Sequence, residues 1–337
     1  MKKTVAIIYG GEGKERKVSI ASANNLSRLI DREKFNLIRV LITSTGEWFI
    51  EKNGKRCPTF PIYINGKSGF HQNETVIKVD AAIPCLHGDM GEDGIIAGAL
   101  RAAHISYVGA DTLAGAACAD KIITKAVAES LGIPTAKWTF ATDRESTASV
   151  QRRAEESFGY PMFIKPANAG SSIGITKVCD AMEFAVAYRR ALLCDKRVLV
   201  EEAIPVFSEL ECAYFELGGK AHFSVGSICT DGKFYDFSEK YASESDIKTT
   251  PSCVADEKAK EAVIEMSRRL RSAFSVNGLG RFDFFITKDG ALYFNEINTF
   301  PGMTPTSLYP ALTLNMGLFE GEFINLLLSE AIYDRRF

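Results

Sequence analysis

The sequence has little histidine and no closely spaced cysteines. Its 337 residues include four His and eight Cys, and no two cysteines form a C-x-x-C motif. Small secreted domains depend on dense disulfide-bonded cysteines, and zinc sites use closely spaced Cys and His ligands. The spacing excludes such a disulfide framework, and we expect the cysteines to be free thiols in a reducing cytosol.

Long apolar runs and charge of one sign are also absent. An apolar stretch at residues 4–9 ends at Gly10 and Gly11, and charged residues follow, so it is too short for a secretory signal. No stretch approaches the roughly 20 apolar residues of a membrane span. The net charge is -2 and the sequence pI is about 6.2, with Lys and Arg scattered along the chain. We therefore expect a cytoplasmic protein with no nucleic-acid and no membrane partner.

Length and periodicity predict several packed units. Hydrophobic residues make up 46% of a chain that is longer than one core usually organises. In the first third, short apolar strands alternate with a helical pattern. This alternation is typical of an α/β unit with a Rossmann-like parallel sheet and crossover helices. The expected strands are residues 4–9, 35–42 and 76–86, and the expected helix is residues 18–30.

A second unit is expected to begin near Asp111. Helical periodicity covers residues 112–131, and Gly132 and Pro134 end it. The pattern then mixes strands and helices, which indicates an α+β arrangement toward the C-terminus. Expected strands are residues 161–165, 198–202, 212–217 and 222–228, followed by a polar stretch at 238–251, a long helix at 256–273, a hairpin and a final helix.

A hairpin is predicted within residues 279–299. Asp289 and Gly290 stand between two alternating apolar runs, and Gly accepts the positive φ that a tight turn requires. With these two residues as the turn, Lys288 faces Ala291. Counting outward from this pair fixes the register of the whole hairpin.

This register places four polar side chains on one face of the hairpin. It pairs Asp283 with Glu296 and Arg281 with Asn298, and residues two apart in a strand share a face. Directly opposed acids repel each other, which is unfavourable in a purely structural sheet. Two carboxylates and an amide oxygen suit Mg2+ held together with substrate phosphates. The alternative is a surface ladder in which Arg281 neutralises both acids.

A Gly/Ser loop follows the strand expected at residues 161–165. Lys165 ends that strand, and Gly170, Ser171 and Ser172 come shortly after it. Such a loop offers backbone N–H groups and a cation to phosphate oxygens. Its order of residues is not that of a Walker P-loop. An ordinary turn remains the alternative interpretation.

Two polar segments follow strands in the first third. Residues 10–13 do not match the dinucleotide-binding fingerprint. Glu15 could hold a substrate ammonium there, or only favour the dipole of the next helix. His87 lies in a Gly-rich break and has no metal-ligand spacing around it, so a core or capping role is the plain interpretation.

With these segments in order, the chain resembles the D-alanine–D-alanine ligases of the ATP-grasp superfamily over essentially its whole length. Each motif alone is weak, but their order and spacing together are highly specific. The anchors are Gly10-Gly11 with residues 15–19, His87-Gly88 with 91–94, Lys165-Pro166 with 170–174, Tyr235-Asp236 with 239–241, 281–283, and 295–299 with Pro301, Gly302 and Ser307.

The resemblance implies a three-domain ATP-grasp architecture. It comprises an N-terminal substrate-binding α/β domain (1–110), a central ATP-grasp subdomain (111–206) and a C-terminal catalytic subdomain (207–337). A lid loop is implied at about residues 236–252, because water must be kept from the intermediate. A plain surface loop is the alternative for that segment.

The resemblance also implies roles for individual residues. Lys121 and Lys165 would grip the ATP phosphates, and Glu201 and Glu209 would meet the adenine amine and the ribose. The remaining ATP-binding residues implied are Ser171, Ser172, Glu202 and Lys240, and the metal ligands are Asp283, Glu296 and Asn298. Glu15, linked through Ser171 to Tyr241, would face the ammonium of the first substrate and His87 its carboxylate. Arg281 and the N–H of Gly302 would bind the oxyanion, and Lys240, Ser307 and Leu308 complete the substrate-binding set.

The implied reaction is ATP-dependent ligation of two D-alanine molecules to D-alanyl-D-alanine for peptidoglycan precursor synthesis. The first carboxylate attacks the γ-phosphorus of ATP and forms an acyl phosphate, with Mg2+ or Mn2+, two ions per site, and Lys offsetting the charge. The second amine then attacks the acyl carbon, and preorganised donors stabilise the oxyanion. A homodimer is also implied.

Three other functions compete with this one. A D-alanine–D-serine or D-lactate ligase of the same family is the nearest alternative; Tyr241 suits an amine acceptor and Leu308 suits the methyl group of D-alanine. A nucleotide-binding oxidoreductase lacks its fingerprint here. An inactive ATP-binding regulator has no need of Lys165, Arg281 and Glu296 together.

Overall fold

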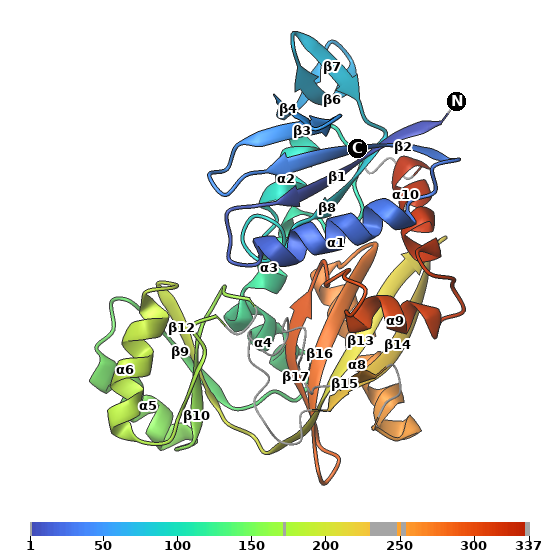
Figure 1. The fold of residues 1–337 in the computed structure, drawn as a ribbon. Helices are drawn as coiled ribbons and strands as arrows, with labels where there is room; N and C mark the ends of the chain where they lie inside the picture. Colours follow the sequence, from blue (N-terminus) through green and yellow to red (C-terminus); the bar gives the residue numbers. More distant parts are fainter. Residues whose placement is uncertain (1, 171–172, 230–247, 251–253, 334–337) are drawn as a thin grey trace.

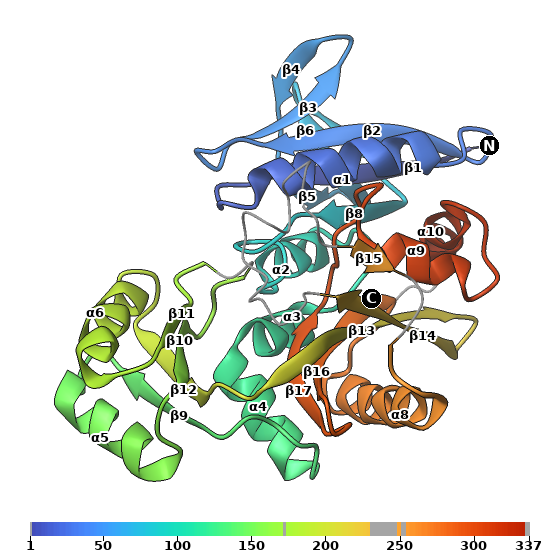
Figure 2. The ribbon, with the colours of Figure 1, turned by 60° about the horizontal axis from the view of Figure 1, so that its bottom comes forward.

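The computed structural model describes residues 2–170, 173–229, 248–250 and 254–333. In these residues the strands form four sheets, and helices pack against them. Figure 1 shows the N-terminal sheet above two further sheets that lie side by side, and Figure 2 shows the same arrangement from another direction. The predicted boundaries at residues 110 and 206 stay a prediction.

The N-terminal sheet has a parallel centre and an antiparallel edge. Its strand order is β4-β3-β2-β1-β8, with β2 and β8 parallel to β1, and β3 and β4 antiparallel at the edge. The predicted parallel sheet is therefore mixed, since short turns connect β2, β3 and β4 and cannot make a parallel crossover. The bounds are β1 (Lys3–Gly10), α1 (Arg16–Leu29), β2 (Phe35–Ile42), β3 (Trp48–Lys52), β4 (Lys55–Pro58), β8 (Ala81–Cys85) and α2 (Ile95–Ala102).

The strand expected at residues 76–86 is two strands in different sheets. Thr75–Lys78 (β7) joins β5 (Pro61–Ile64) and β6 (Lys67–Gln72) in a small antiparallel sheet, and only β8 joins the main one. Asp80 lies between them and accepts hydrogen bonds from Thr4 N at 2.9 Å and Lys3 Nζ at 3.3 Å. These bonds anchor the break at the start of β1.

The helix expected at residues 112–131 is also divided. It forms α3 (Thr112–Ala119) and α4 (Lys121–Ser130), because Asp120 has an extended backbone, with φ -91° and ψ 109°. The Asp120 carboxylate accepts hydrogen bonds from Ile122 N at 2.9 Å and Ile123 N at 3.0 Å. Asp120 thus caps α4 and places Lys121 at its first residue.

The central sheet is antiparallel, with strand order β11-β10-β12-β9. Helices α5 and α6 cover one face, where Phe184, Tyr188 and Val150 are buried. The other face looks toward α4. The bounds are β9 (Trp138–Thr142), α5 (Thr147–Ser157), β10 (Met162–Pro166), β11 (Thr176–Val178), α6 (Ala181–Leu192) and β12 (Arg197–Glu202).

The C-terminal sheet is antiparallel throughout, with strand order β15-β14-β13-β16-β17. Helix α8 packs on it together with α3 and α4. The bounds are β13 (Val206–Leu217), β14 (Lys220–Cys229), β15 (Lys248–Thr250), α8 (Glu257–Phe274), β16 (Leu279–Thr287), β17 (Leu292–Asn298), α9 (Leu308–Leu314) and α10 (Glu322–Tyr333).

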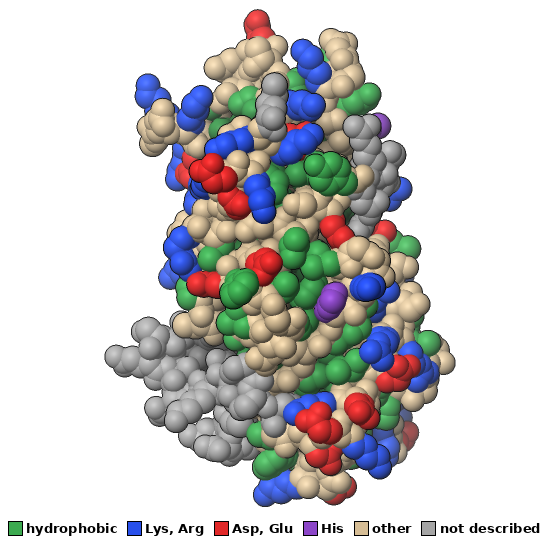
Figure 3. Space-filling view, turned by 90° about the vertical axis from the view of Figure 1, so that its right-hand side faces the viewer, with side chains coloured by type: hydrophobic (Ala, Val, Ile, Leu, Met, Phe, Trp, Pro, Cys, Tyr) green, Lys and Arg blue, Asp and Glu red, His purple; other side chains and the backbone are tan. Residues whose placement is uncertain are grey.

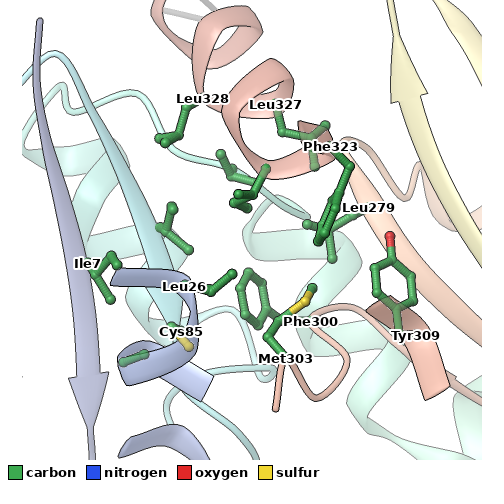
Figure 4. Packing of buried hydrophobic residues seen from close by; sticks show 14 of the residues in the cluster. Ile7, Leu26, Cys85, Leu279, Phe300, Met303, Tyr309, Phe323, Leu327 and Leu328 are labelled. Carbon is green, nitrogen blue, oxygen red and sulfur yellow. The ribbon is translucent and has the colours of Figure 1, made fainter. Parts of the chain in front are cut away.

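One apolar core joins the N-terminal sheet to the C-terminal part of the chain. Figure 4 shows Ile7 of β1 and Leu26 of α1 packed toward Phe300, Met303 and residues of α10. Asn25 adds a polar tie, since its Nδ2 donates to Met303 O at 2.9 Å. Burial of large apolar side chains stabilises such a contact strongly. The loop after β17 is therefore fixed against α1.

The face drawn in Figure 3 has no patch of side chains that are all acidic or all basic among its described residues. In Figure 3 the acidic and basic side chains are interspersed, and apolar side chains gather across the middle of the face. Within the described residues, we find no helix with the length and hydropathy of a membrane span.

Candidate active site

The hairpin of β16 and β17 has the predicted register at its functional end. Arg281 opposes Asn298 and Asp283 opposes Glu296. The turn itself was predicted wrongly: Thr287 N donates to Ala291 O at 3.0 Å, so three residues, not two, form the turn.

A bulge compensates for this longer turn. The register shifts between Asp283 and Phe284, because Phe284 pairs with Phe294 while Asp283 pairs with Glu296. Asn295 is the extra residue, as expected for a β-bulge, and it restores the pairing that the two-residue turn had predicted. The predicted pairing is thus correct at the site, although the predicted path from the turn is not.

The four predicted side chains converge on one face. Arg281 donates from Nε and Nη2 to the two oxygens of Asp283, both at 2.7 Å. Asn298 Nδ2 donates to Asp283 Oδ2 at 2.9 Å. Burial disfavours the charged form of Arg281, but Asp283, Glu211 and Glu296 outweigh it and hold the Arg281 pKa well above its usual value. Arg281 is therefore a fixed cation at this site.

Glu211 is a further acid of this site that was not predicted from the sequence. It lies on β13 directly opposite Asp283 of β16. Its Oε1 is 3.4 Å from Arg281 Nη1, and the side chain is buried. Three carboxylates on three adjacent strands thus surround one guanidinium. We call Arg281, Glu211, Asp283 and Glu296 the acid cluster. An acid between the apolar Leu210 and Cys212 was the available sequence signal.

Lys121 connects the acid cluster to the Gly/Ser loop. Its Nζ donates to Ala169 O at 2.6 Å and lies 3.6 Å from Glu296 Oε2. Lys121 is the first residue of α4, where the positive end of the helix dipole disfavours a cation. That arrangement suits an anion held by both the lysine and the helix start.

Lys165 lies in a second group of charges, formed with Glu201 and Lys125. It forms an ion pair with Glu201 Oε1, and Lys125 Nζ is 2.8 Å from Glu201 Oε2. Lys165 is on β10, Glu201 on β12 and Lys125 on α4. We call these three residues the lysine cluster. All three side chains are buried.

The two lysines hold the Glu201 carboxylate ionised against burial. Burial alone would raise the pKa of Glu201, but Lys125 and Lys165 outweigh it and lower that pKa to about 2. Burial lowers the pKa of Lys125, and Glu201 opposes this shift. Lys125 was not predicted from the sequence. Its spacing of four residues from Lys121 places both on one side of a helix and is the signal that was missed.

The N-terminal part contributes Glu15, whose carboxylate lies between two glycines. A Cβ on Gly88 would lie 2.2 Å from Glu15 Oε2, and one on Gly170 would lie 3.0 Å from it. Gly88 also has φ +65°, which favours glycine. Glu15 therefore connects the loop after β8 to the Gly/Ser loop, as required of a residue that faces a substrate between them.

A second carboxyl group accompanies Glu15. Glu92 Oε2 accepts a hydrogen bond from Gly88 N at 2.9 Å. Burial first, and then the charge of Glu15, raise the pKa of Glu92 to about 8. Burial and the neighbouring Glu15 thus disfavour the charged form of Glu92, which adds little negative charge beside Glu15 near pH 7.

His87 is buried beside α1. Its Nε2 lies 3.1 Å from Ser22 Oγ, and Ser22 Oγ also accepts a hydrogen bond from Met303 N at 3.1 Å. Burial lowers the pKa of His87 to about 4, so the imidazole is neutral near pH 7. His87 thus lies next to the loop that follows β17.

That loop carries the predicted residues Gly302, Ser307 and Leu308. Ser307 Oγ accepts a hydrogen bond from Thr304 N at 3.2 Å and would lie 2.9 Å from a Cβ on Gly302. Leu308 is buried at the start of α9. A side chain at Gly302 would therefore require the Ser307 hydroxyl to move.

Several predicted residues fall elsewhere. Ser171, Ser172, Lys240 and Tyr241 lie outside the described residues. Of the predicted lid at 236–252, the structure describes Lys248–Thr250, which forms the edge strand β15. Glu202 follows Glu201 at the end of β12, and Glu209 lies on β13 opposite Phe285.

The predicted metal ligands offer a suitable set of oxygen donors. Asp283, Glu296 and Asn298 lie on one face and are only partly buried. Carboxylate and amide oxygens are the donors that Mg2+ prefers. Within the described part of the chain, no group of three or more His, Cys, Asp or Glu side chains could hold a metal. The predicted set is smaller, with two acids and an amide, so its metal stays a prediction.

A cleft of about 490 Å³ opens between the N-terminal loops and the Gly/Ser loop. Glu15 and Gly88 line one side, and Ala169 and Gly170 line the other. The cleft gives a small molecule access to Glu15.

Comparison with known proteins agrees with this arrangement. The family model described as D-ala D-ala ligase N-terminus matches residues 4–110, and the one described as D-ala D-ala ligase C-terminus matches residues 127–329. Curated proteins named D-alanine–D-alanine ligase are 36% identical in Deinococcus radiodurans and 35% identical in Caldicellulosiruptor bescii. Each match covers 99% of this chain. It covers 100% of the Deinococcus radiodurans protein and 96% of the Caldicellulosiruptor bescii protein.

Solved structures have the same fold. The VanG D-Ala:D-Ser ligase from Enterococcus faecalis has a TM-score of 0.88 and 33% identity, covering 98% of this chain and 100% of its own. The D-alanyl-alanine synthetase A from Vibrio cholerae has a TM-score of 0.88 and 31% identity, covering 99% of both chains.

The fold and the two charge clusters define an ATP-grasp ligase, and the predicted fold class is confirmed. More specifically, the chain belongs to the D-alanine–D-alanine ligase family.

Proposed function

We propose that this protein uses ATP to ligate two D-alanine molecules to D-alanyl-D-alanine, a precursor for peptidoglycan. The observation that carries the proposal is the convergence of Arg281, Asp283, Glu296 and Asn298 beside Lys121. This arrangement combines a cation for an oxyanion, oxygen donors for a metal and a lysine for phosphate. The names of the curated relatives support the same activity.

In the first step, the carboxylate of one D-alanine attacks the γ-phosphorus of ATP, which forms an acyl phosphate and releases ADP. Lys121 and Lys165 offset the negative charge of the phosphates. Asp283, Glu296 and Asn298 would hold Mg2+ or Mn2+, as two ions per site, which would neutralise phosphate charge. Ser171, Ser172, Glu201, Glu202, Glu209 and Lys240 complete the proposed ATP site.

The first D-alanine is held from the N-terminal side. Glu15 accepts hydrogen bonds from its ammonium group, and Glu92 adds little negative charge beside it near pH 7. His87 is neutral and donates a hydrogen bond toward the carboxylate. This places the reacting carboxylate between α1 and the loop after β17.

In the second step, the neutral amine of the second D-alanine attacks the acyl carbon, and the tetrahedral intermediate expels phosphate as the amide forms. Arg281 has five N–H donors and uses two of them on Asp283, so others remain for the oxyanion. The N–H of Gly302 is the second donor proposed. Ser307 and Leu308 receive the carboxylate and methyl side of the acceptor, and Tyr241 and Ser171 complete the catalytic set.

We further propose the three-part division at residues 110 and 206, with residues 236–252 as the lid. The homodimer and the cytoplasmic location are proposed from the family resemblance and from the free cysteines of the described residues. Reducing compartments keep such thiols unpaired.

A D-serine or D-lactate acceptor is not favoured. Curated relatives carry the D-alanine–D-alanine ligase name, although VanG shows that a D-Ala:D-Ser ligase has the same fold. Leu308 is buried and apolar, which suits a methyl group better than a hydroxyl group.

Product identification tests the proposal. The purified protein is given Mg-ATP and equal amounts of D-alanine, D-serine and D-lactate, and the ADP and products are quantified. We expect D-alanyl-D-alanine as the main product. ADP release without any dipeptide, or a mixed product in excess, would refute the assignment.

A further inference from the structure

The lysine cluster contains one lysine more than its carboxylate needs. Lys125 and Lys165 contact different oxygens of Glu201. Lys125 is 2% exposed and Glu201 is 2% exposed, so solvent screens these charges poorly. Two ammonium groups on one carboxylate leave a net positive charge in a buried place.

The two lysines have different surroundings. Lys125 is buried on the face of α4 that packs toward β12. Glu129 of the same helix attracts Lys125 more weakly than Glu201 does. Glu129 itself is held by Trp138 Nε1 at 2.8 Å and by Thr135 Oγ1 at 3.1 Å. Lys165 lies one residue before Pro166, where β10 leads into the Gly/Ser loop. Lys165 is therefore the one placed to reach a phosphate.

We propose that Lys125 is a positioning residue of the nucleotide site: it remains on Glu201 as a permanent counter-ion and so allows Lys165 to leave that carboxylate for a nucleotide phosphate. The inference rests on the proposed function, because it requires Lys165 to contact bound nucleotide.

The cost of moving Lys165 explains the need for Lys125. A buried carboxylate left without a cation is strongly unfavourable. With Lys125 2.8 Å from Glu201 Oε2, the carboxylate stays neutralised when Lys165 departs. Without Lys125, Lys165 must either stay on Glu201 or leave only when Glu201 takes up a proton. In both cases nucleotide binding weakens.

Lys125→Met tests this, because Met retains the length of the side chain without its charge. Lys177→Met is the matched control, since Lys177 is exposed on β11 of the same sheet. We expect Lys125→Met to weaken Mg-ATP binding about tenfold or more in calorimetry, and to raise the KM for ATP similarly. The KM for D-alanine should not change.

Thermal stability without nucleotide separates this role from a structural one. In Lys125→Met, Glu201 still pairs with Lys165, so no buried charge is left alone and Tm should stay close to that of Lys177→Met. A merely structural lysine would instead lower Tm and leave the nucleotide affinity of the folded protein unchanged, which would overturn the inference.

The double variant Lys125→Met/Glu201→Gln gives the sharpest test. It removes the carboxylate that retains Lys165, so its ATP affinity should return to that of Glu201→Gln alone. Additive losses in the double variant would contradict the inference.

The outcomes distinguish this inference from the proposed function. A wild-type protein that makes D-alanyl-D-alanine, together with an unchanged Lys125→Met variant, overturns the inference alone. A wild-type protein that binds no nucleotide overturns both.

Discussion

The acid cluster and the lysine cluster have opposite excess charge. The acid cluster places Glu211, Asp283 and Glu296 around the single cation Arg281. In the lysine cluster the ratio is reversed, with two lysines on one carboxylate. Excess negative charge is suited to metal ions and excess positive charge to phosphates. Helix α4 links the two clusters, since Lys121 lies 3.6 Å from Glu296 and Lys125 pairs with Glu201, so together they suit both parts of a metal–nucleotide complex.

The two clusters also differ in how they are built. The acid cluster lies on three neighbouring strands of one sheet, and hydrogen bonds from Arg281 at 2.7 Å and from the adjacent Asn298 at 2.9 Å fix Asp283 at its centre. The lysine cluster joins helix α4 to two strands of another sheet. The first is suited to hold donors in place during the reaction, and the second contains an ion pair that can exchange its partner.

The largest expected effect is that of Arg281→Lys in the acid cluster. Lysine retains the charge but cannot form the bidentate pair with Asp283. We expect kcat to fall about 10²- to 10³-fold, as when an oxyanion donor is lost. Steady-state ADP release at saturating substrates measures this. A kcat within threefold of the wild type would show that Arg281 does not stabilise the oxyanion.

Asp283→Asn should impair metal binding without changing the lysine cluster that is proposed to bind phosphate. The substitution keeps the shape but removes one charge from the acid cluster. We expect the Mg2+ concentration for half-maximal activity to rise about 10- to 100-fold, while the lysine cluster is undisturbed. Activity is titrated with Mg2+ at fixed ATP. An unchanged titration curve would mean that this carboxylate does not serve the metal.

Gly88→Ala tests the N-terminal side, outside both clusters. Its Cβ would lie 2.2 Å from Glu15 Oε2, whereas Gly132 has a similar φ of +67° and no atom within 4 Å. Gly132→Ala should therefore lower the free energy of unfolding by about 1 kcal/mol through backbone strain alone. Gly88→Ala should lower it by about 1–3 kcal/mol more.

Urea unfolding of both variants measures this difference. Gly88→Ala should also raise the KM for D-alanine, because Glu15 must move. Equal losses in the two variants would show that the Glu15 carboxylate is not held beside Gly88 and moves aside without cost.

The smallest expected effect concerns the pH dependence of stability. The pKa of His87 is lowered to about 4 in the folded protein, so between about pH 6.5 and 4 only the unfolded chain takes up this proton. Its stabilising effect is complete above pH 6.5 and is lost as the pH falls toward 4. We expect the free energy of unfolding to fall by on the order of 1–3 kcal/mol over this pH interval.

The measurement compares the free energy of unfolding against pH in the wild type and His87→Gln. His104→Gln is the control, because His104 is exposed. The His87 variant should have the flatter profile below pH 6.5. Parallel profiles would mean that His87 is not buried in the neutral form.

The sequence predicted the acid cluster better than the lysine cluster, for a physical reason. Arg281, Asp283, Glu296 and Asn298 lie within one hairpin, where alternation alone decides which side chains share a face. Glu211 comes from a strand that is distant in sequence, and nothing local indicates its neighbour. The predicted pairing at the site is correct although the predicted turn is one residue too short, because the bulge at Asn295 compensates for the longer turn.

The lysine cluster depends on packing between separate elements. Lys125 and Glu201 meet because α4 lies beside the central sheet, and the break at Asp120 sets the start of that helix. A continuous helical pattern conceals such a break, since a cap becomes visible only when its hydrogen bonds are known. The antiparallel edge of the N-terminal sheet was missed in the same way, because strand direction depends on the connections.

A crystal structure with Mg2+ and a non-hydrolysable ATP analogue would test the central claim most directly. We expect Mg2+ on Asp283, Glu296 and Asn298, with Lys165 on a phosphate and Lys125 still on Glu201. Phosphates bound away from Lys121 and Lys165, or a metal held by other residues, would contradict it.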